Sequence, residues 1–191
     1  MNFLAHAYLS PPDQPGVLVG NVIADFVKGR ARFTLPADLQ RGFDLHRRID
    51  TFTDTHPIPA HCADLLDANW GRYAPVLVDI FFDHILAAEW AAHHAQPLAP
   101  FVQNLYSTLY AFRPHLPDRA LLATTAMRAD DWLTSYASLD GIALNLSRLS
   151  RRLRHEVELA PAVHDFTTHR AAFYDAFNSF WPELKRAVQN A

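Results

Sequence analysis

The hydrophobic positions of the chain recur mainly at helical intervals. In one segment Phe43, Ile49 and Phe52 follow the period of about 3.6 residues that keeps side chains on one face of a helix, and neither Gly nor Pro interrupts residues 43–56. Residues 74–95 have the same period with a more apolar composition. No stretch sustains the alternation of apolar and polar residues that a half-buried strand requires. The pattern therefore predicts an all-α fold.

Proline and glycine residues divide this pattern into helical segments. Gly29 is expected to close the second segment, and Pro57 and Pro59 the third. We expect helices over residues 3–10, 17–28, 38–56, 61–70, 74–95, 97–112, 118–136, 139–156 and 161–181. Pro182 is expected to kink the last helix. No internal repeat or long linker separates the segments, so we expect residues 1–191 to form a single-domain helical bundle.

The composition and charge exclude several classes of protein. Of the 191 residues, 50% are hydrophobic and 19% are charged, which excludes a disordered chain. The formal net charge of -3 argues against a general nucleic-acid binder, since such proteins carry an excess of Lys and Arg. The lone Cys62 has no partner for an internal disulfide, which fits a reducing compartment. We therefore expect a cytoplasmic protein without a nucleic-acid partner.

No segment is expected to target or cross a membrane. The first residues lack the positive charge and the long apolar run of a signal peptide. The most apolar window, residues 76–92, is interrupted by Asp79, Asp83, His84 and Glu89, and such groups are costly inside a bilayer. We therefore expect a soluble chain without a membrane span.

The segment 42–57 concentrates side chains that can bind metals or transfer protons. It contains two His, three Asp and two Arg. His46 and Asp50 are four residues apart and lie in or beside the apolar stripe, so we expect both to point inward, with Asp54 one turn further. A buried carboxylate is costly unless a cation or a strong donor meets it. A divalent metal and Arg47 are both candidates for that partner.

Further acidic and histidine residues lie on other predicted helices. Asp79 and Asp83 are one turn apart, and His84 follows Asp83 directly. Asp25 on an earlier helix supplies a third carboxylate, and His6 is a further imidazole. Helices that bring His and Asp inward could surround a divalent ion, and such nitrogen and oxygen ligands suit manganese, iron, magnesium or zinc.

Each of these residues also has a structural interpretation. Asp83 and His84 could be satisfied polar groups of the core or partners of an Arg on the central helix. Asp25 could accept a backbone N–H or pair with Lys28. His6 could be a packed side chain that needs only one or two hydrogen bonds. The residues alone leave both interpretations open.

Positive charge gathers in the first quarter of an otherwise acidic chain. The residues are Lys28, Arg30, Arg32, Arg41, Arg47 and Arg48. Guanidinium groups match phosphate and carboxylate oxygens, so this segment suits a phosphate or an acidic protein surface. The structural alternative is a solvated helix surface on which Asp44 pairs with Arg48.

Four ordered blocks of the sequence resemble one known family. The blocks are Met1-Asn2-Phe3-Leu4-Ala5-His6, Gly20-Asn21-Val22-Ile23-Ala24-Asp25-Phe26-Val27-Lys28-Gly29, Leu45-His46-Arg47-Arg48-Ile49-Asp50 with Thr53-Asp54, and Asp79 followed by Asp83-His84. Together they resemble the bacterial acyl carrier protein phosphodiesterases, also called acyl carrier protein hydrolases. The likeness is dense over the first half of the chain and continues in length and helical texture to its end.

The resemblance implies a fold, a reaction and a cofactor. The family is a divergent relative of the HD-type metal-dependent phosphohydrolases, which implies an all-α, HD-phosphohydrolase-like fold with a divalent-metal site that favours manganese. The implied reaction hydrolyses the phosphodiester between 4′-phosphopantetheine and a serine of holo-acyl carrier protein, which gives apo-carrier protein and belongs to fatty acid metabolism. The HD order is not reproduced literally, because the adjacent pair here is Asp83-His84, while His46 and Asp50 are a turn apart.

Resemblance and residue chemistry together give three candidate sets. The metal ligands are expected among Asp25, His46, Asp50, Asp79, Asp83 and His84, with Asp54 in or beside the site. The expected catalytic set is Asp25, His46, Arg47, Asp50 and His6. Within it, Arg47 or Arg48 would neutralise charge on the phosphate, and His6 or another free His would protonate the departing serine oxygen. The acidic carrier protein is expected to contact Lys28, Arg30, Arg32, Arg41 and Arg48.

Two other functions are compatible with the same residues. One is an HD-like phosphohydrolase that acts on a nucleotide or another small phosphoester and needs no carrier protein. The other is a non-catalytic helical module that binds carrier proteins, holds no metal and keeps its function when Asp50 is changed to Asn. Inward-facing Asp and His from several helices favour an enzyme, because a docking surface does not need them inside.

Overall fold

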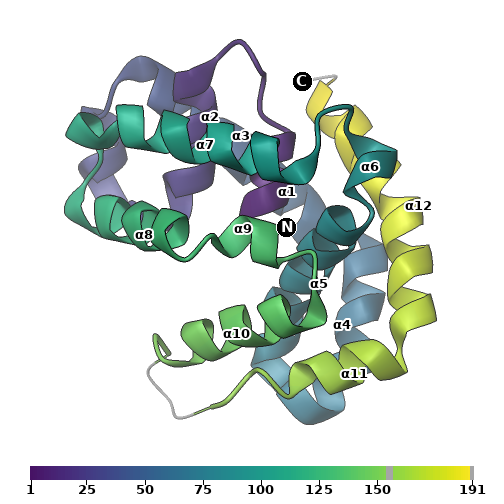
Figure 1. Cartoon of the computed structure of the whole chain (residues 1–191). Helices are drawn as coiled ribbons and strands as arrows, with labels where there is room; N and C mark the ends of the chain where they lie inside the picture. Colours follow the sequence, from purple (N-terminus) through teal and green to yellow (C-terminus); the bar gives the residue numbers. More distant parts are fainter. Residues whose placement is uncertain (154–156, 190–191) are drawn as a thin grey trace.

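The computed structural model describes residues 1–153 and 157–189, and every regular element in these two ranges is a helix (Figure 1). The α-helices are α1 (Phe3–Tyr8), α2 (Pro15–Ile23), α3 (Ala37–Thr55), α4 (Pro57–Trp70), α5 (Ala74–Ala88), α6 (Trp90–His93), α7 (Leu98–Ala111), α8 (Asp118–Ala129), α9 (Trp132–Ser135), α10 (Leu139–Ser150), α11 (Ala162–Thr168) and α12 (Arg170–Gln189). Short 3-10 helices lie between some of them: η1 (Ala24–Phe26), η2 (Gly29–Thr34), η3 (Gly71–Tyr73) and η4 (Arg113–His115). The predicted all-α fold is confirmed. None of the described helices is long and apolar enough to cross a membrane.

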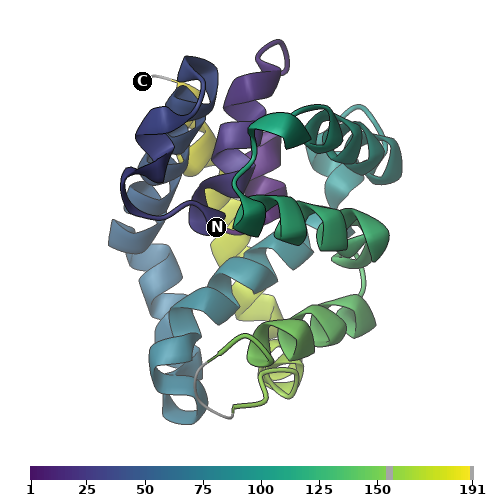
Figure 2. The ribbon, with the colours of Figure 1, turned by 90° about the vertical axis from the view of Figure 1, so that its left-hand side faces the viewer.

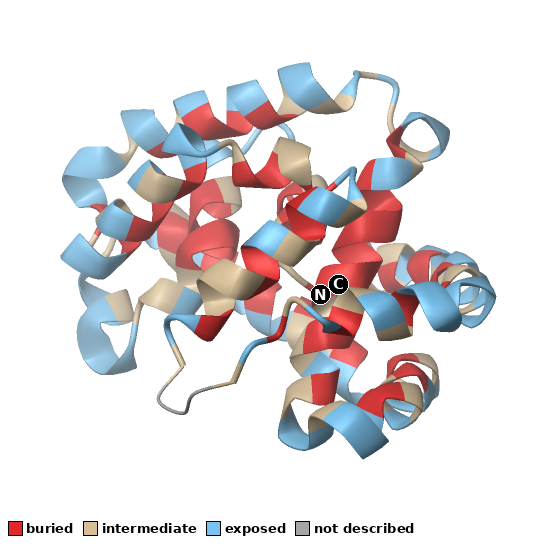
Figure 3. Ribbon diagram, turned by 60° about the horizontal axis from the view of Figure 1, so that its bottom comes forward, coloured by how far each residue is buried: buried red, intermediate tan, exposed pale blue. Residues whose placement is uncertain are grey.

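The core is built around α5, which contacts α1, α4, α10 and α12 (Figure 1). Its buried Phe81 lies 4.8 Å from Phe166 of α11 between ring centroids, and its Phe82 lies 5.6 Å from Phe177 of α12. Burying one such ring stabilises the fold by about 1.5–3 kcal/mol. Figure 3 shows that the buried segments face the interior and the exposed ones face outward. The aromatic residues of the C-terminal helices are therefore part of the core.

Three predicted helices are each divided into two α-helices where the sequence carries neither Gly nor Pro. The segment 161–181 divides at His169 into α11 and α12. The segment 74–95 divides at Glu89 into α5 and α6. The segment 118–136 divides into α8 and α9 beside Asp131, whose φ of 45° cannot continue a right-handed helix. The predicted helix over 139–156 ends as α10 at Ser150, and its last three residues lie outside the described part of the chain.

The helix α3 ends at Thr55, just before Pro57, as the sequence predicts, but the next helix begins at Pro57 itself. Pro57 is the first residue of α4 and Pro59 lies in its first turn, because a proline there has no N–H that would need a helical partner. The helix therefore begins before the predicted residue 61. Pro182 lies inside α12, which continues to Gln189.

The helices α2 and α3 approach so closely that their backbones touch. A Cβ atom added to Gly42 would lie 2.6 Å from the Asn21 backbone nitrogen, and one added to Gly20 would lie 2.8 Å from the Leu39 carbonyl carbon. Any side chain larger than hydrogen would push the two helices apart. This contact brings the Asn21 carbonyl oxygen of α2 within 2.8 Å of His46 on α3.

We expect Gly42→Ala to destabilise the protein, although alanine favours helices by about 1 kcal/mol over glycine. Forcing a methyl group between packed backbones costs more, so the free energy of unfolding should fall by about 1–3 kcal/mol. Denaturant titration followed by circular dichroism measures this change. The control Asn104→Ala, on the exposed face of α7, should stay within about 0.5 kcal/mol of the unchanged protein. Equal stability of both variants would contradict the expected cost of placing a methyl group between α2 and α3.

Candidate metal centre

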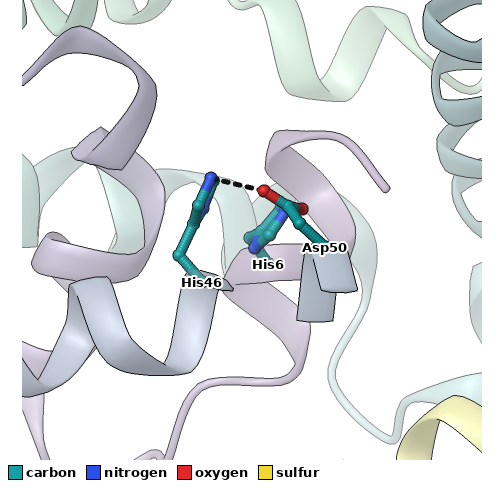
Figure 4. A group of neighbouring side chains, drawn as sticks. All are labelled: His6, His46 and Asp50. Atoms are coloured by element: carbon teal, nitrogen blue, oxygen red, sulfur yellow. Dashed lines mark ion pairs between the residues drawn. The ribbon is translucent and has the colours of Figure 1, made fainter. Parts of the chain in front are cut away.

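Three helices bring polar side chains to one point in the N-terminal part of the molecule. His46 on α3 is 8% exposed and Asp50, one turn later, is half-buried, as their spacing predicts. His6 on α1 is 2% exposed and stacks on His46, with ring centroids 4.2 Å apart. Figure 4 shows the two rings beside one another with the Asp50 carboxylate turned toward them. Asp25 of η1 joins the group from its solvent side.

Asn21, fully buried in α2, fixes the orientation of both imidazole rings. Its side-chain Oδ1 lies 2.8 Å from His6 Nδ1, and its backbone oxygen lies 2.8 Å from His46 Nδ1. Asn21 Nδ2 donates to the His6 carbonyl oxygen and to Ser10 Oγ, which identifies Oδ1 as the acceptor. Each Nδ1 must therefore carry the proton, and each neutral ring presents the lone pair of its Nε2.

The two Nε2 atoms converge on the carboxylate of Asp50. His6 Nε2 lies 3.1 Å from Asp50 Oδ1, and His46 Nε2 lies 2.9 Å from Asp50 Oδ2. Asp25 Oδ1 lies 3.3 Å from His46 Nε2. Although His6 Nε2 is buried and close to Asp50, it makes no hydrogen bond of acceptable geometry to any described residue. Such orphaned buried nitrogens are rare and call for a partner.

These donor atoms fit a divalent cation. One ligand atom from each of His6, His46 and Asp50 lies within 4.8 Å of the other two. Imidazole nitrogens combined with carboxylate oxygens are a common ligand set for first-row transition metals. Lone pairs on two nitrogens repel a carboxylate unless a proton or a cation lies between them. Asn21 is then the outer partner that orients both ligands, as metal-binding histidines usually require.

The charges within the group shift the pKa of each member in the metal-free protein. Burial alone would lower the pKa of His46, but Asp25 and Asp50 raise it to about 9. Burial alone would raise the pKa of the Asp50 carboxyl, but His46 and His6 hold it well below its usual range. Burial lowers the pKa of His6. His46 is therefore the protonated ring, and its proton stands where a cation would lie.

Asp83 lies outside this group and caps the start of α1. The fully buried carboxylate accepts from the Leu4 N–H at 2.7 Å, from the Ala5 N–H at 3.2 Å and from the Asn2 N–H at 3.3 Å. Burial raises the pKa of Asp83 to about 7, against the opposing effect of these N–H donors. Asp83 therefore holds the helix that carries His6.

His84 and Asp79 also have other partners. His84 Nδ1 lies 2.7 Å from the Tyr136 carbonyl oxygen, which joins α5 to the end of α9. Asp79 Oδ1 accepts from the Met1 amine at 2.8 Å. For Asp83 and His84, the contacts support the structural interpretation. From the expected ligand set, the structure brings together Asp25, His46 and Asp50. Asp79, Asp83 and His84 instead pair with other groups, namely the Met1 amine, the first N–H groups of α1 and the Tyr136 carbonyl oxygen.

The sequence alone does not assign the roles that His6 and Asn21 have in this centre. His6 is absent from the expected ligands, and Asn21 is not expected to orient them. His6 is expected from the sequence only as a proton donor or a packed side chain, because its short segment offers no second ligand at helical spacing. Asn21 receives no separate role. A signal for it exists, since an amide inside the apolar segment Val17–Ile23 must satisfy its hydrogen bonds within the core.

The expected basic residues lie on the outer side of the same region. Arg47 donates to Asp44 Oδ1 at 2.8 Å and is 58% exposed, so it faces away from the metal centre. Asp44 thus pairs with Arg47 rather than with the expected Arg48. Arg32 is half-buried and stacks on Phe33, with its Cζ 4.4 Å from the ring centroid. The remaining expected carrier contacts are exposed, namely Lys28, Arg30, Arg41 and Arg48.

Comparison with known proteins points to one family. A family model described as acyl carrier protein phosphodiesterase matches residues 1–184. The acyl carrier protein phosphodiesterase of Yersinia pestis is 31% identical over 191 residues, which cover 100% of this chain and 98% of the relative. The one from Photorhabdus laumondii subsp. laumondii is also 31% identical, over 100% of this chain and 96% of the relative. The one from Escherichia coli O157:H7 is 30% identical over 185 residues, 96% and 95% of the two chains. No solved structure matches the chain significantly.

We expect His46 in the metal-free protein to keep its proton up to about pH 9, instead of losing it near the ordinary histidine value of about 6.5. NMR titration of the His46 ring protons in chelated protein measures this midpoint. Asp50→Asn removes one of the two stabilising carboxylates and should lower the midpoint by about one unit or more. Asp44→Asn, on the solvent side of α3, should leave it unchanged. A midpoint near 6.5 in the unchanged protein would contradict the geometry.

Proposed function

The chain belongs to the acyl carrier protein phosphodiesterase family, and on this premise we propose that it hydrolyses the phosphodiester joining 4′-phosphopantetheine to a serine of holo-acyl carrier protein. The products of that reaction are apo-acyl carrier protein and free 4′-phosphopantetheine. Membership of the family makes the chain a hydrolase. Beyond this membership, we propose the substrate, the metal and the roles of the individual residues.

The observation that carries the proposal is the convergence of two imidazole Nε2 atoms on the Asp50 carboxylate. We assign His6, His46 and Asp50 as metal ligands, and Asp25 as a further ligand from the solvent side. A binding module for carrier proteins has no need for an orphaned histidine nitrogen inside the fold. The arrangement therefore favours catalysis over docking alone.

We assign manganese as the metal and HD-type phosphohydrolase chemistry as the reaction class. The mixed nitrogen and oxygen ligands suit manganese, and they also suit iron, zinc and magnesium. The preference for manganese and the HD-like fold rest on the resemblance of the sequence blocks to the acyl carrier protein phosphodiesterases, which are divergent relatives of the HD-type phosphohydrolases. Histidine and aspartate ligands from separate helices support both assignments.

The residues of the centre have distinct tasks in this reaction. A divalent cation bound there supplies the Lewis acidity that makes water nucleophilic near neutral pH. Asn21 keeps a proton on each Nδ1, so that both Nε2 atoms stay available as ligands. His6 suits a ligand better than a proton donor, because burial lowers its pKa. We assign Arg47 no role at the phosphate, because it faces solvent.

The departing serine oxygen needs a proton, and Asp54 is the carboxyl in this region best suited to hold one. It lies one turn beyond Asp50 on α3. Burial raises its pKa, and the neighbouring carboxylates of Asp79 and Asp50 raise it further. A carboxyl with a raised pKa is a stronger candidate for a general acid near neutral pH than one with an ordinary value.

The exposed basic residues beside the centre are the proposed contact for the acidic carrier protein. Lys28 and Arg30 lie at the start of η2, directly after the segment that carries Asp25. Arg41 and Arg48 are exposed on α3, the helix of His46 and Asp50. Charges at the rim of an interface mainly increase the association rate and fix orientation, and salt weakens them.

We expect the unchanged protein with manganese to convert holo-acyl carrier protein to the apo form, and Asp50→Asn to lose this activity by a factor of about 100 or more, because the substitution removes a ligand. Mass spectrometry of the intact carrier protein measures the conversion. Excess chelator should stop it. The matched control is Asp44→Asn, which changes an exposed carboxylate on the same helix and should keep full activity.

Two results would contradict this proposal. One is conversion at the same rate in chelator and in manganese. The other is an unchanged carrier mass while the protein is folded and binds manganese, which would favour a nucleotide or another small phosphoester as substrate.

We expect Arg30→Glu and Arg41→Glu, made separately, to lower kcat/KM for holo-carrier protein by about tenfold at low salt, because each reverses a charge at the proposed contact. The effect should shrink as ionic strength rises, since salt screens exposed charges. Arg170→Glu makes the same change at the start of α12 and should have no effect. If all three variants behave alike, the docking surface lies elsewhere.

A further inference from the structure

A cavity of about 360 Å³ opens beside the candidate metal centre. Its walls come from the N-terminal end of α1 and from η1, α5, α8, α9 and α10. Figure 2 shows the N-terminus lying between the segment that carries η1 and η2 and the helices α8 and α9. The volume falls within the range of about 300–1,000 Å³ that is typical of small-molecule sites.

One end of the cavity meets the metal centre through a shared residue. Asp25 lines the cavity, and its Oδ1 lies 3.3 Å from His46 Nε2. Asp79, on the neighbouring wall from α5, lines the same space. A ligand bound to the metal centre through one end can therefore extend into the cavity.

Another wall of the cavity carries guanidinium groups. Arg152 lies over the ring of Trp132, with its Cζ 4.9 Å from the centroid, and Arg148 makes an ion pair with Asp130 at 3.0 Å. Arg119 of α8 lines the same cavity. Stacking and pairing restrict the positions of Arg148 and Arg152. Each of the three guanidinium groups offers several N–H donors to a carbonyl or anionic oxygen.

The cavity also has an apolar wall. Phe3 and Phe26 stack with ring centroids 5.5 Å apart, and Val76 of α5 and Leu149 of α10 add aliphatic surface. A ligand that fits this space therefore combines apolar groups with hydrogen-bond acceptors.

We infer that this cavity binds the pantetheine arm of the substrate while the phosphate lies at the metal centre. The inference rests on the proposed function, because it takes His6, His46 and Asp50 to hold the phosphate through the metal. From the phosphate, the arm continues as a narrow chain with a geminal dimethyl group and then two amides. The methyl groups match the apolar wall, and the amide oxygens match the arginine donors. The carrier protein stays outside, since its serine joins the other side of the phosphate.

Isothermal titration calorimetry on the manganese-loaded protein tests this assignment by comparing 4′-phosphopantetheine with inorganic phosphate. We expect 4′-phosphopantetheine to bind about tenfold more tightly, because only this ligand reaches the cavity. Leu149→Trp fills the cavity and should abolish the difference while the affinity for phosphate is unchanged. The matched control is Leu144→Trp, at a position of α10 that is 49% exposed, and it should keep the difference.

Arg152→Ala is a second variant that does not disturb core packing, because Arg152 is exposed. Arg152→Ala should reduce the ratio of the affinities for 4′-phosphopantetheine and phosphate from about tenfold to about threefold. Its circular dichroism spectrum should be unchanged. Equal affinity of the unchanged protein for 4′-phosphopantetheine and phosphate would overturn the assignment. A ratio of these affinities of about tenfold that persists in both Leu149→Trp and Arg152→Ala would also overturn it. Failure of the proposed function has another signature, namely holo-carrier protein whose mass stays unchanged in the presence of manganese.

Discussion

Asn21 holds both histidines of the candidate metal centre, one through its side-chain oxygen and one through its backbone oxygen. The backbone contact exists because Gly20 and Gly42 let α2 and α3 touch. The side-chain contact exists because the same amide donates to the His6 carbonyl oxygen, which fixes its orientation. The backbone contact needs no particular side chain, but the two side-chain contacts need one acceptor and one donor, which an amide supplies. A carboxylate there would lack the donor and would add a charge beside two rings that have to stay neutral to bind a metal.

The sequence predicts the part of the centre that lies on one helix and much less of the part that depends on contacts between helices. His46 and Asp50 are four residues apart beside an apolar stripe, and helical geometry alone brings them together. Asp83 and His84 are consecutive, so a helix directs them about 100° apart and they serve different neighbours, α1 and α9. His6 belongs to a short helix whose position is set by residues far along the chain, and periodicity carries no information about such distances.

Some helix boundaries are likewise set by local backbone chemistry, and others are set by packing between helices. The end of α3 before Pro57 follows from local backbone chemistry, and it was predicted. The breaks at Glu89 and beside Asp131 have no proline or glycine to mark them, and they were not predicted. Near both breaks, a large side chain is buried in the core, Trp90 in one case and Trp132 in the other. Packing of these rings competes with continuation of the helix, and a linear pattern does not record that competition.

The helix α1 is six residues long, which is too short to be stable by itself. Its first N–H groups bind the carboxylate of Asp83, and 79 positions separate Leu4 from that carboxylate. During synthesis, His6, His46 and Asp50 therefore emerge before the residue that orders the helix of His6. The candidate metal centre can be completed only after α5 has emerged and folded against the N-terminal helices. The order of synthesis thus delays assembly of the full candidate ligand set until the core has begun to form.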